Sequence, residues 1–304
     1  RATSAGTFHD DPLRILRGLR LRGTLGFTLS ADTERLMMAA LPELDQVSGE
    51  RVRDELVQIL LLRKAAPSLA YGRRLGIWNT VLPKIAVPGI WCRAVETLRA
   101  LEEAVGSWLV PQTEGRDVLT PIQRALARYE TYLTGYWSTE LSSGRPRAAS
   151  TKLSALFSGF REGKGERALE AMQRLRLSGR EIDHVQMALR AQKRWSDLIG
   201  GKALAAIEIY RYFRRAGEAG VDGVLIRLAQ DLAEPTTEEG VPSLVSAAKA
   251  VLCAWFEERA RWIDPPSLVS GHEVMRVLDV SPGPIVGDLL EHVREAQVQG
   301  LVDN

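Results

Sequence analysis

The sequence predicts an all-α protein, and three observations support that prediction. Apolar residues make up 45% of the chain and recur at helical spacing. Leucine, alanine, arginine and glutamate, which all favour helices, are frequent. Runs of alternating β-branched residues, which would indicate strands, are almost absent. We therefore expect an elongated series of helical modules.

The first predicted helix follows Pro12 and carries a repeat of arginines. Proline suits the first turn of a helix, where its missing N–H costs nothing, and Asp10 or Asp11 would cap this helix or stabilise its positive end. At about 100° per residue, the polar face is a slanting ladder opposite a buried apolar face. The ladder consists of Asp11, Arg14, Arg17 and Arg20.

A solvated amphipathic helix would explain this ladder, but three features favour a binding role. All the cations are arginines, whose planar forks suit phosphates and base edges. Arginines spaced three residues apart repel one another slightly unless an anion lies near them. An aspartate one turn from an arginine places acceptors beside donors, as recognition of a base edge requires.

The helices that follow are delimited by turn and capping residues. Gly26 is expected to end the first helix, and Ser30 to cap the second. Ser48 is a further N-cap candidate, ahead of a helix through residues 51–64. Breaks rich in proline, glycine or serine recur further along the chain. We expect three parts: residues 1–85, 86–200 and 201–304.

Composition and charge restrict the classes of protein that this chain can represent. Two cysteines far apart form no disulfide framework, which favours a reducing cytoplasm. The longest aliphatic run, Leu56–Leu62, is too short to span a bilayer, so no membrane partner is expected. The chain has a net charge of +2, but five arginines and two aspartates give residues 1–25 a net +3. An anionic partner near this end is therefore plausible.

Three segments within residues 8–85 carry a resemblance to a known family. The segments DDPLRILRGLRLRGTLGFTL, VSGERVRDELVQILL and AYGRRLGIWNTVLP follow one another in that order. Together they resemble class II tRNA nucleotidyltransferases and bacterial poly(A) polymerases, whose pattern is EDxxRxLRxxRF, LGF, SxERIxxEL and LxxLGLLxxLxP. Asp10 stands in place of the usual glutamate, and Leu21 in place of the usual phenylalanine.

The resemblance implies a role for each residue of the ladder. Asp11 and Arg14 would pair with the base of incoming ATP or CTP, as a template made of protein. Arg17 and Arg20 would support the nucleotide near its phosphates. The SGERVRDEL segment resembles a helix-stabilising motif of the family, so its Glu55 is expected to be structural rather than catalytic.

A later segment, Ala171–Trp195, resembles the family's body pattern LRLSxREIxxV. Its basic residues are candidates for contact with the backbone of tRNA or of another RNA 3′ end, although a solvated helical face is the alternative for each. These residues are Arg174, Arg176, Arg180, Arg190 and Lys193. Body and tail would then recognise tRNA by shape and phosphate contact.

The residues that catalyse nucleotidyl transfer are missing from this sequence. The reaction uses metal ions held by paired carboxylates, and no D-x-D occurs among the 304 residues. In the family these carboxylates belong to a head that precedes the EDxxR motif, so Mg²⁺ is expected only through such a head. The resemblance thus implies a neck, body and tail that select nucleotides and bind RNA but do not transfer nucleotides alone. The alternative is a non-catalytic helical RNA-binding or scaffold protein derived from the family.

No metal site is expected in this chain. His9 and Asp10 spell the HD dipeptide of metal-dependent phosphohydrolases, but no histidine precedes them to complete the ligand set. Residues 151–160 resemble the LAALLHDIG helix of relatives with an HD-type body, and Ser158 and Gly159 stand where histidine and aspartate would be. An HD-like body without its metal is therefore expected. The cluster of Glu181, Asp183 and His184 is interpreted as surface charge.

Overall fold

The protein is described by a computed structural model covering residues 4, 6–110, 119–159, 164–198, 204–234 and 240–302. Within these ranges nearly all regular structure is helical, which confirms the all-α prediction. The strands described are β1 (Glu140–Ser142) and β2 (Arg145–Pro146), an antiparallel pair with Glu140 opposite Pro146. Gly144 turns between them with a φ angle of 74°. So small a hairpin cannot form a core of its own.

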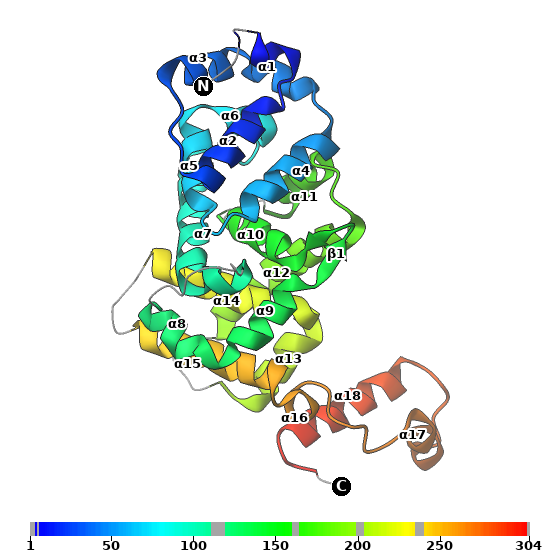
Figure 1. The fold of residues 1–304 in the computed structure, drawn as a ribbon. Helices are drawn as coiled ribbons and strands as arrows, with labels where there is room; N and C mark the ends of the chain where they lie inside the picture. Colours follow the sequence, from blue (N-terminus) through cyan, green and yellow to red (C-terminus); the bar gives the residue numbers. More distant parts are fainter. Residues whose placement is uncertain are drawn as a thin grey trace.

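The amino-terminal part is a cluster of helices at the upper end of Figure 1. Its elements are α1 (Thr7–Asp10), α2 (Arg14–Leu25), α3 (Ala31–Ala39), the 3-10 helix η1 (Leu41–Gln46), α4 (Gly49–Leu60), α5 (Ala66–Arg74) and α6 (Ile77–Val81). Helix α2 packs against both α4 and α5. Its Ile15, Leu16 and Leu19 are fully buried, which leaves the arginine face pointing away from the core.

Two of the predicted boundary signals act as expected, and two do not. Gly26 ends α2 in the left-handed conformation, with a φ angle of 68°. The Ser30 hydroxyl caps α3 by accepting from the Thr33 N–H at 3.3 Å. Ser48 precedes α4 without a side-chain capping bond. The prediction that Asp10 or Asp11 caps α2 is wrong, because α2 follows Leu13 and has no side-chain cap.

The body is a larger helical assembly below these elements. It comprises α7 (Pro88–Leu109), α8 (Pro121–Leu126), η2 (Ala127–Tyr129), α9 (Glu130–Ser138), α10 (Arg147–Phe157), α11 (Lys164–Arg174), α12 (Gly179–Leu198), α13 (Ala206–Ala216), η3 (Gly217–Ala219), α14 (Gly220–Ala233) and α15 (Gly240–Phe256). Helix α14 packs against α7, α12 and α15, so it lies at the centre. Trp108, Trp137 and Trp195 are buried in this assembly, as expected of packing residues.

The carboxy-terminal helices project from the body in Figure 1. They are α16 (Arg259–Trp262), α17 (Gly271–Leu278) and α18 (Pro284–Val298). Ion pairs attach α18 to α13, between Arg211 and Glu295 at 2.6 Å and between Arg214 and Glu291 at 3.0 Å. The Tyr210 hydroxyl also donates to Glu291 at 2.8 Å.

A single hydrophobic core runs from Phe8 to Ile263 through the neck and body helices. This continuity fixes the arginine face of α2 relative to the body, because both rest on the same packed interior. The division at residues 85 and 200 stays a prediction.

Candidate nucleotide-binding site and nucleic-acid interface

Asp11 lies at the centre of the predicted ladder. Its carboxylate is 3.9 Å from Arg14 Nε and 3.6 Å from Arg17 Nη1. A third guanidinium, that of Arg51 on α4, donates to Asp11 at 3.2 Å. The Asp11 side chain is 22% exposed and the Arg14 side chain 46% exposed. The structure therefore places Asp11 and Arg14 together on an accessible face, where acceptor and donor atoms lie side by side.

Glu55 of α4 holds the other half of the ladder. One carboxylate oxygen accepts from Arg17 Nε and the other from Arg20 Nε, each at 2.9 Å. The Glu55 side chain is only 11% exposed, so these charge-assisted bonds lie at the edge of the core. This carboxylate offsets the repulsion between the two arginines, so the spacing of Arg17 and Arg20 does not by itself require a bound anion.

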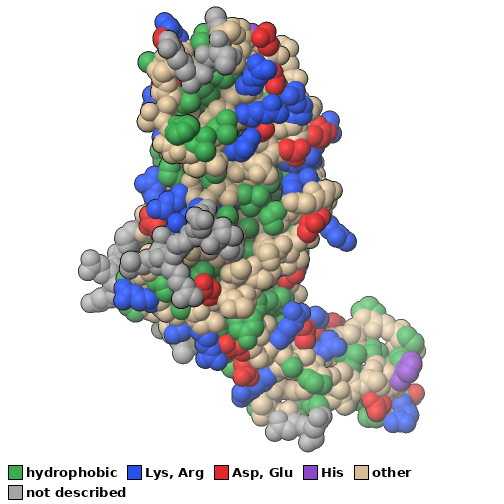
Figure 2. Space-filling model, in the orientation of Figure 1, with side chains coloured by type: hydrophobic (Ala, Val, Ile, Leu, Met, Phe, Trp, Pro, Cys, Tyr) green, Lys and Arg blue, Asp and Glu red, His purple; other side chains and the backbone are tan. Residues whose placement is uncertain are grey.

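The ladder keeps an excess of positive charge after this internal pairing. Four guanidiniums, including that of Arg51, face the two carboxylates of Asp11 and Glu55, so the group carries a net +2. Figure 2 shows basic side chains gathered over this part of the molecule. A partly exposed cationic group that is already held in place is suited to an anionic ligand.

Sequence reasoning missed a second cationic group at the end of α2. The Arg22 and Arg74 guanidinium carbons lie 3.9 and 4.5 Å from the centre of the Tyr71 ring. Arg74 also pairs with Glu34 at 2.6 Å, and the Tyr71 hydroxyl donates to the same carboxylate. Hydrogen bonds from Arg74 and Tyr71 lower the pKa of Glu34. The group ties α2 to α3 and α5, and Arg22 and Glu34 are too far from Tyr71 in the sequence for a local pattern to reveal it.

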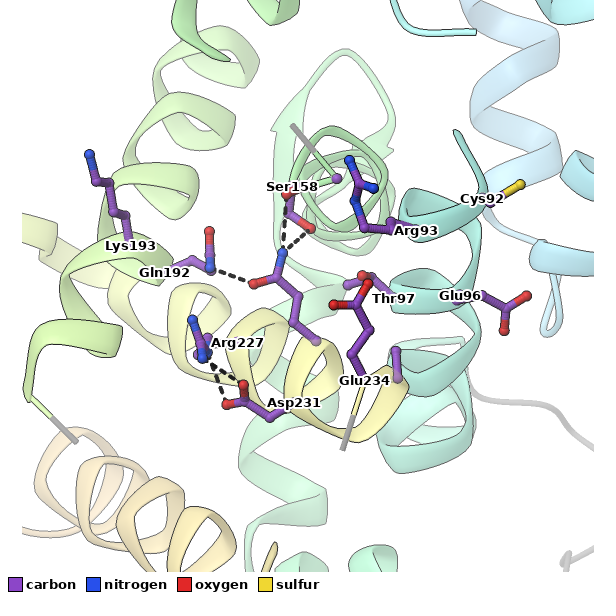
Figure 3. A pocket seen from close by; sticks show the side chains of 13 residues that line it. Cys92, Arg93, Glu96, Thr97, Ser158, Gln192, Lys193, Arg227, Asp231 and Glu234 are labelled. Atoms are coloured by element: carbon purple, nitrogen blue, oxygen red, sulfur yellow. Dashed lines mark hydrogen bonds and ion pairs between the residues drawn. The ribbon is translucent and has the colours of Figure 1, made fainter. Parts of the chain in front are cut away.

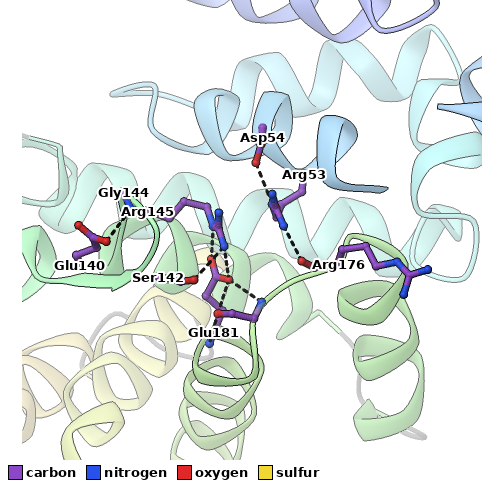
Figure 4. A network of polar contacts seen from close by, with 9 residues as sticks. Arg53, Asp54, Glu140, Ser142, Gly144, Arg145, Arg176 and Glu181 are labelled. Atoms are coloured by element: carbon purple, nitrogen blue, oxygen red, sulfur yellow. Dashed lines mark hydrogen bonds and ion pairs between the residues drawn. The ribbon is translucent and has the colours of Figure 1, made fainter. Parts of the chain in front are cut away.

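Of the candidate RNA-contacting residues, Arg174 and Arg176 lie at the end of α11, against the start of α4 (Figure 1). Arg174 is exposed, but it pairs with Asp45 and donates to the Thr80 carbonyl at 3.0 Å. Arg176 has a positive φ angle of 52°, and its carbonyl accepts from Arg53 at 2.7 Å (Figure 4). Both residues line a cavity of about 440 Å³ between neck and body.

The remaining candidates, Arg180, Arg190 and Lys193, are all exposed on α12. Lys193 also lines a cavity of the body. The structure thus leaves these three side chains accessible, and their contact with RNA stays a prediction.

The interpretation of Glu181 and His184 as surface charge is wrong, although Asp183 is exposed. Glu181 is 2% exposed and binds Arg145 through bonds of 2.7 and 2.9 Å (Figure 4). Burial raises the pKa of Glu181, but hydrogen bonds from Arg145 and Ser178 outweigh it and leave the pKa lowered. Ser178 is only three residues away, but Arg145 comes from a distant segment, so the helix alone did not reveal the burial.

His184 faces a carboxylate at the centre of the body. Its Nε2 lies 2.8 Å from Asp222, which is completely buried. Asp222 also accepts from Tyr136, Trp137 and Thr151 at 2.8 to 2.9 Å. This carboxylate is therefore fully engaged in holding helices together.

Ser158 and Gly159 lie where α10 meets α7. They occupy the positions at which an HD site would have its histidine and aspartate. A Cβ atom on Gly159 would stand 2.9 Å from the Ile90 carbonyl and 2.9 Å from the Ala94 side chain. An aspartate would therefore displace the α7 backbone. In the described part of the chain, no group of three or more His, Cys, Asp or Glu residues could hold a metal ion. His9, of the HD dipeptide, contacts Glu43 at 2.6 Å.

No helix within the described ranges is both long and apolar enough to cross a membrane.

Comparison with known proteins connects this fold to RNA-processing proteins. Residues 26–87 match the family described as "Probable RNA and SrmB- binding site of polymerase A". The chain is 29% identical to an A-adding tRNA nucleotidyltransferase of Deinococcus radiodurans, over 99% of this chain and 68% of that protein. It is also 29% identical to a CC-adding tRNA nucleotidyltransferase of Thermus thermophilus, over 97% of this chain and 64% of that protein.

Solved structures show the same fold. A CCA-adding enzyme in an apo form matches 100% of this chain and 59% of its own, with a TM-score of 0.62 at 18% identity. A Thermotoga maritima CCA-adding enzyme complexed with tRNA matches 100% of this chain and 61% of its own, with the same TM-score and identity. The chain thus spans about two thirds of the length of these relatives.

Proposed function

Because this chain is homologous to tRNA nucleotidyltransferases along nearly its whole length, we propose that it is the nucleotide-selecting and RNA-binding part of such an enzyme. The reaction of the whole protein adds CMP or AMP to the 3′ end of tRNA and releases pyrophosphate. The observation that carries this proposal is the face of α2 on which Asp11 and Arg14 lie together beside Arg17 and Arg20.

This face has the groups needed to select a base. A carboxylate accepts hydrogen bonds from amino groups of a base, and a guanidinium donates to its ring nitrogens and carbonyls. Asp11 and Arg14 supply these two functions one helical turn apart. Arg17 and Arg20 lie next along the helix, where their positive charge attracts the phosphates of ATP or CTP. Glu55 fixes both guanidiniums before the nucleotide arrives, which lowers the entropic cost of binding.

The body provides the contacts with RNA in this proposal. Exposed arginines and lysines bind phosphates without regard to sequence, which suits an enzyme that acts on every tRNA. The proposed residues are Arg174, Arg176, Arg180, Arg190 and Lys193.

Nucleotidyl transfer itself is assigned to residues outside this sequence. The 304 residues contain no D-x-D pair. The described residues also do not fit Mg²⁺, because they offer no cluster of carboxylates that could hold it. We therefore expect the chain alone to select and bind but not to transfer, and we derive no catalytic step from it.

The test uses the full-length product of the gene and a tRNA transcript lacking its 3′ nucleotides. We expect Asp11→Ala and Arg14→Ala each to lower the incorporation rate and the discrimination between ATP and CTP. Arg35→Ala is the matched control, because this exposed arginine of α3 pairs only with Asp32 among the described residues. Wild-type selectivity in both variants would overturn the template role. A full-length product that binds tRNA but never extends it would instead favour the non-catalytic RNA-binding protein.

A further inference from the structure

The body contains a cavity that the proposed function does not use. It has a volume of about 630 Å³ and lies among α7, the end of α10, α12 and α14 (Figure 3). Pockets for small molecules commonly measure 300 to 1,000 Å³. This one is lined mainly by polar and charged side chains, which indicates a polar ligand.

One wall of the cavity is fixed by hydrogen bonds between its own side chains. Gln192 Nε2 donates to Gln230 Oε1 at 2.5 Å. Gln230 Nε2 in turn donates to the carbonyl and the hydroxyl of Ser158 at 3.1 and 3.0 Å. Arg227 pairs with Asp231 at 2.6 Å, so these two charges offset each other (Figure 3). The wall is thus preorganised, and its orientation does not depend on a ligand.

Two cations of the lining are not committed in this way. Arg93 on α7 is half-buried, and its Nε atom is buried without a hydrogen-bond partner. Lys193 on α12 is exposed and forms no ion pair within the described ranges. A buried guanidinium nitrogen that has lost water and gained no acceptor is unfavourable, and an oxyanion would satisfy it.

We propose that this cavity binds the phosphate of a nucleoside monophosphate or of a terminal nucleotide of RNA. Arg93 would hold the phosphate through its buried Nε, near Ser158 and Thr97 (Figure 3); the Ser158 hydroxyl already donates to the Ala155 carbonyl at 2.7 Å and would not bind the phosphate. Lys193 lies at the rim and attracts the anion. The size fits a nucleotide rather than a bare phosphate ion, since a phosphate alone would leave most of the volume empty.

This inference does not rest on the neck site, and the two are tested separately. The 304-residue chain carrying Asp11→Ala and Arg14→Ala removes the proposed base-reading pair while the cavity stays intact. Isothermal titration of this double variant with AMP and with adenosine then reports on the cavity. We expect AMP to bind and adenosine, which lacks the phosphate, to bind at least about tenfold more weakly.

Further substitutions in the same background locate the ligand. Arg93→Gln and Lys193→Gln are each expected to weaken AMP binding, by about tenfold for the half-buried arginine and less for the exposed lysine. Arg124→Gln, on an exposed arginine of α8 outside the cavity, should leave AMP affinity unchanged. Thermal unfolding checks that Arg93→Gln folds, and Lys193→Gln tests the same site without altering a buried group.

The proposal is overturned if AMP does not bind the double variant at millimolar concentration, or if neither cavity substitution weakens it. A tRNA transcript competing with AMP would identify the phosphate as that of RNA. AMP binding undisturbed by saturating tRNA would identify it as that of a free nucleotide.

Discussion

At the scale of single residues, Glu55 explains why an arginine ladder is stable on one helix. Arginines three residues apart repel one another, yet the structure gives Arg17 and Arg20 a shared carboxylate at 2.9 Å. The same carboxylate fixes their orientation. Glu55 is therefore a positioning residue for the proposed nucleotide site rather than a group that touches the nucleotide.

Replacing Glu55 by glutamine should weaken nucleotide use without unfolding the protein. Glutamine has a similar shape but no charge, so the bonds to Arg17 and Arg20 weaken and both side chains gain freedom. We expect the KM for ATP and CTP in the full-length protein to rise by about tenfold, with a smaller change in kcat. An unchanged KM, with a normal melting temperature, would contradict the positioning role.

Asp222 predicts how stability depends on pH. Burial raises the pKa of Asp222, but contacts with His184, Trp137 and Tyr136 outweigh burial and leave the pKa below its usual value. A carboxylate with a lowered folded pKa stabilises fully above its unfolded pKa of about 3.9, and the effect disappears as pH falls through the folded pKa.

Asp222→Asn should therefore destabilise the protein by about 3 kcal/mol at pH 7, because it leaves His184 facing an uncharged amide in the core. Urea unfolding at pH 7, 4 and 3 measures the difference from wild type, which should shrink toward acid. A difference that stays constant with pH would show that the lost hydrogen bonds, and not the charge, account for it.

Residue-level prediction succeeded where the signal was local. Asp11 lies outside α2, but only three residues before Arg14, and a turn in which the Arg14 N–H donates to the Asp11 carbonyl at 3.1 Å keeps the two side chains close. The burial of Glu181 did not follow, because its partner Arg145 is 36 residues away. The free-energy cost of burying a carboxylate can be offset by a partner far away in the sequence, and a helical wheel does not show such a partner.

At the scale of elements, a buried ion pair connects the neck to the body. Lys152 of α10 is fully buried and donates to Glu102 of α7 and to the Leu62 carbonyl, both at 2.7 Å. Glu102 also accepts from the N–H groups of Ala65 and Ala66 at the start of α5. Burial lowers the pKa of Lys152, and Glu102 opposes this change. The Glu102 carboxylate thus satisfies groups from two other elements, the start of α5 and α10.

Glu102→Ala should destabilise the protein by about 3 to 5 kcal/mol, since it leaves an ammonium and two N–H groups buried without their acceptor. Glu102→Gln keeps an acceptor oxygen in the same place, so its cost should be smaller. Urea denaturation of the two variants against wild type measures both effects. Equal losses in the alanine and glutamine variants would mean that the negative charge of Glu102, and not its packing or its acceptor oxygen, stabilises this contact.

Gly159 shows that the contact between α10 and α7 cannot accommodate the aspartate of an HD site. Gly159→Asp should lower stability by about 1 to 3 kcal/mol, because its Cβ atom collides with the Ile90 carbonyl. Mn²⁺ titration should detect no new site. Gly135→Asp is the matched control, since nothing lies within 4 Å of a Cβ atom there. Tight Mn²⁺ binding by Gly159→Asp alone would show that the backbone yields and the ligand geometry is recovered.

Element boundaries were predictable where one residue sets the backbone. Gly26 adopts the left-handed conformation and Ser30 caps the next helix, as the sequence predicts. The start of α2 was not predictable in this way, because the Asp11 carboxylate faces the arginines and does not accept from the free N–H groups at the start of the helix. Asp11 can either cap α2 or pair with arginines, and the outcome depends on the position of Arg51 on α4. The sequence around Asp11 does not contain that information.

At the scale of the whole molecule, the neck and the tail lie at opposite ends of the body (Figure 1). The all-α class and the order of helices follow from periodicity, whereas the central place of α14 depends on packing among distant segments. In the proposed function, a nucleotide binds the neck and RNA binds the body. The helices of both parts pack on one continuous hydrophobic core, so the two binding surfaces have a fixed position relative to each other.

The salt dependence of tRNA binding tests how the body contributes. Each phosphate contact that releases a counterion steepens the decrease of log affinity with log salt by about 0.7 to 0.9. Arg190 is exposed and forms no ion pair in the described part of the chain, so Arg190→Ala should reduce this slope by about that amount. Arg174 already pairs with Asp45, so Arg174→Ala should change the slope less.

Filter binding of a tRNA transcript to the 304-residue chain, between 50 and 300 mM salt, measures these slopes. Arg35→Ala on the neck serves as the control, because it removes one exposed arginine from outside the proposed interface. If Arg190→Ala and Arg35→Ala flatten the slope equally, binding follows overall charge and the assignment to α12 is wrong. A decrease of the slope confined to Arg190→Ala places an RNA phosphate against α12, since only a phosphate contact that releases a counterion on binding alters the slope.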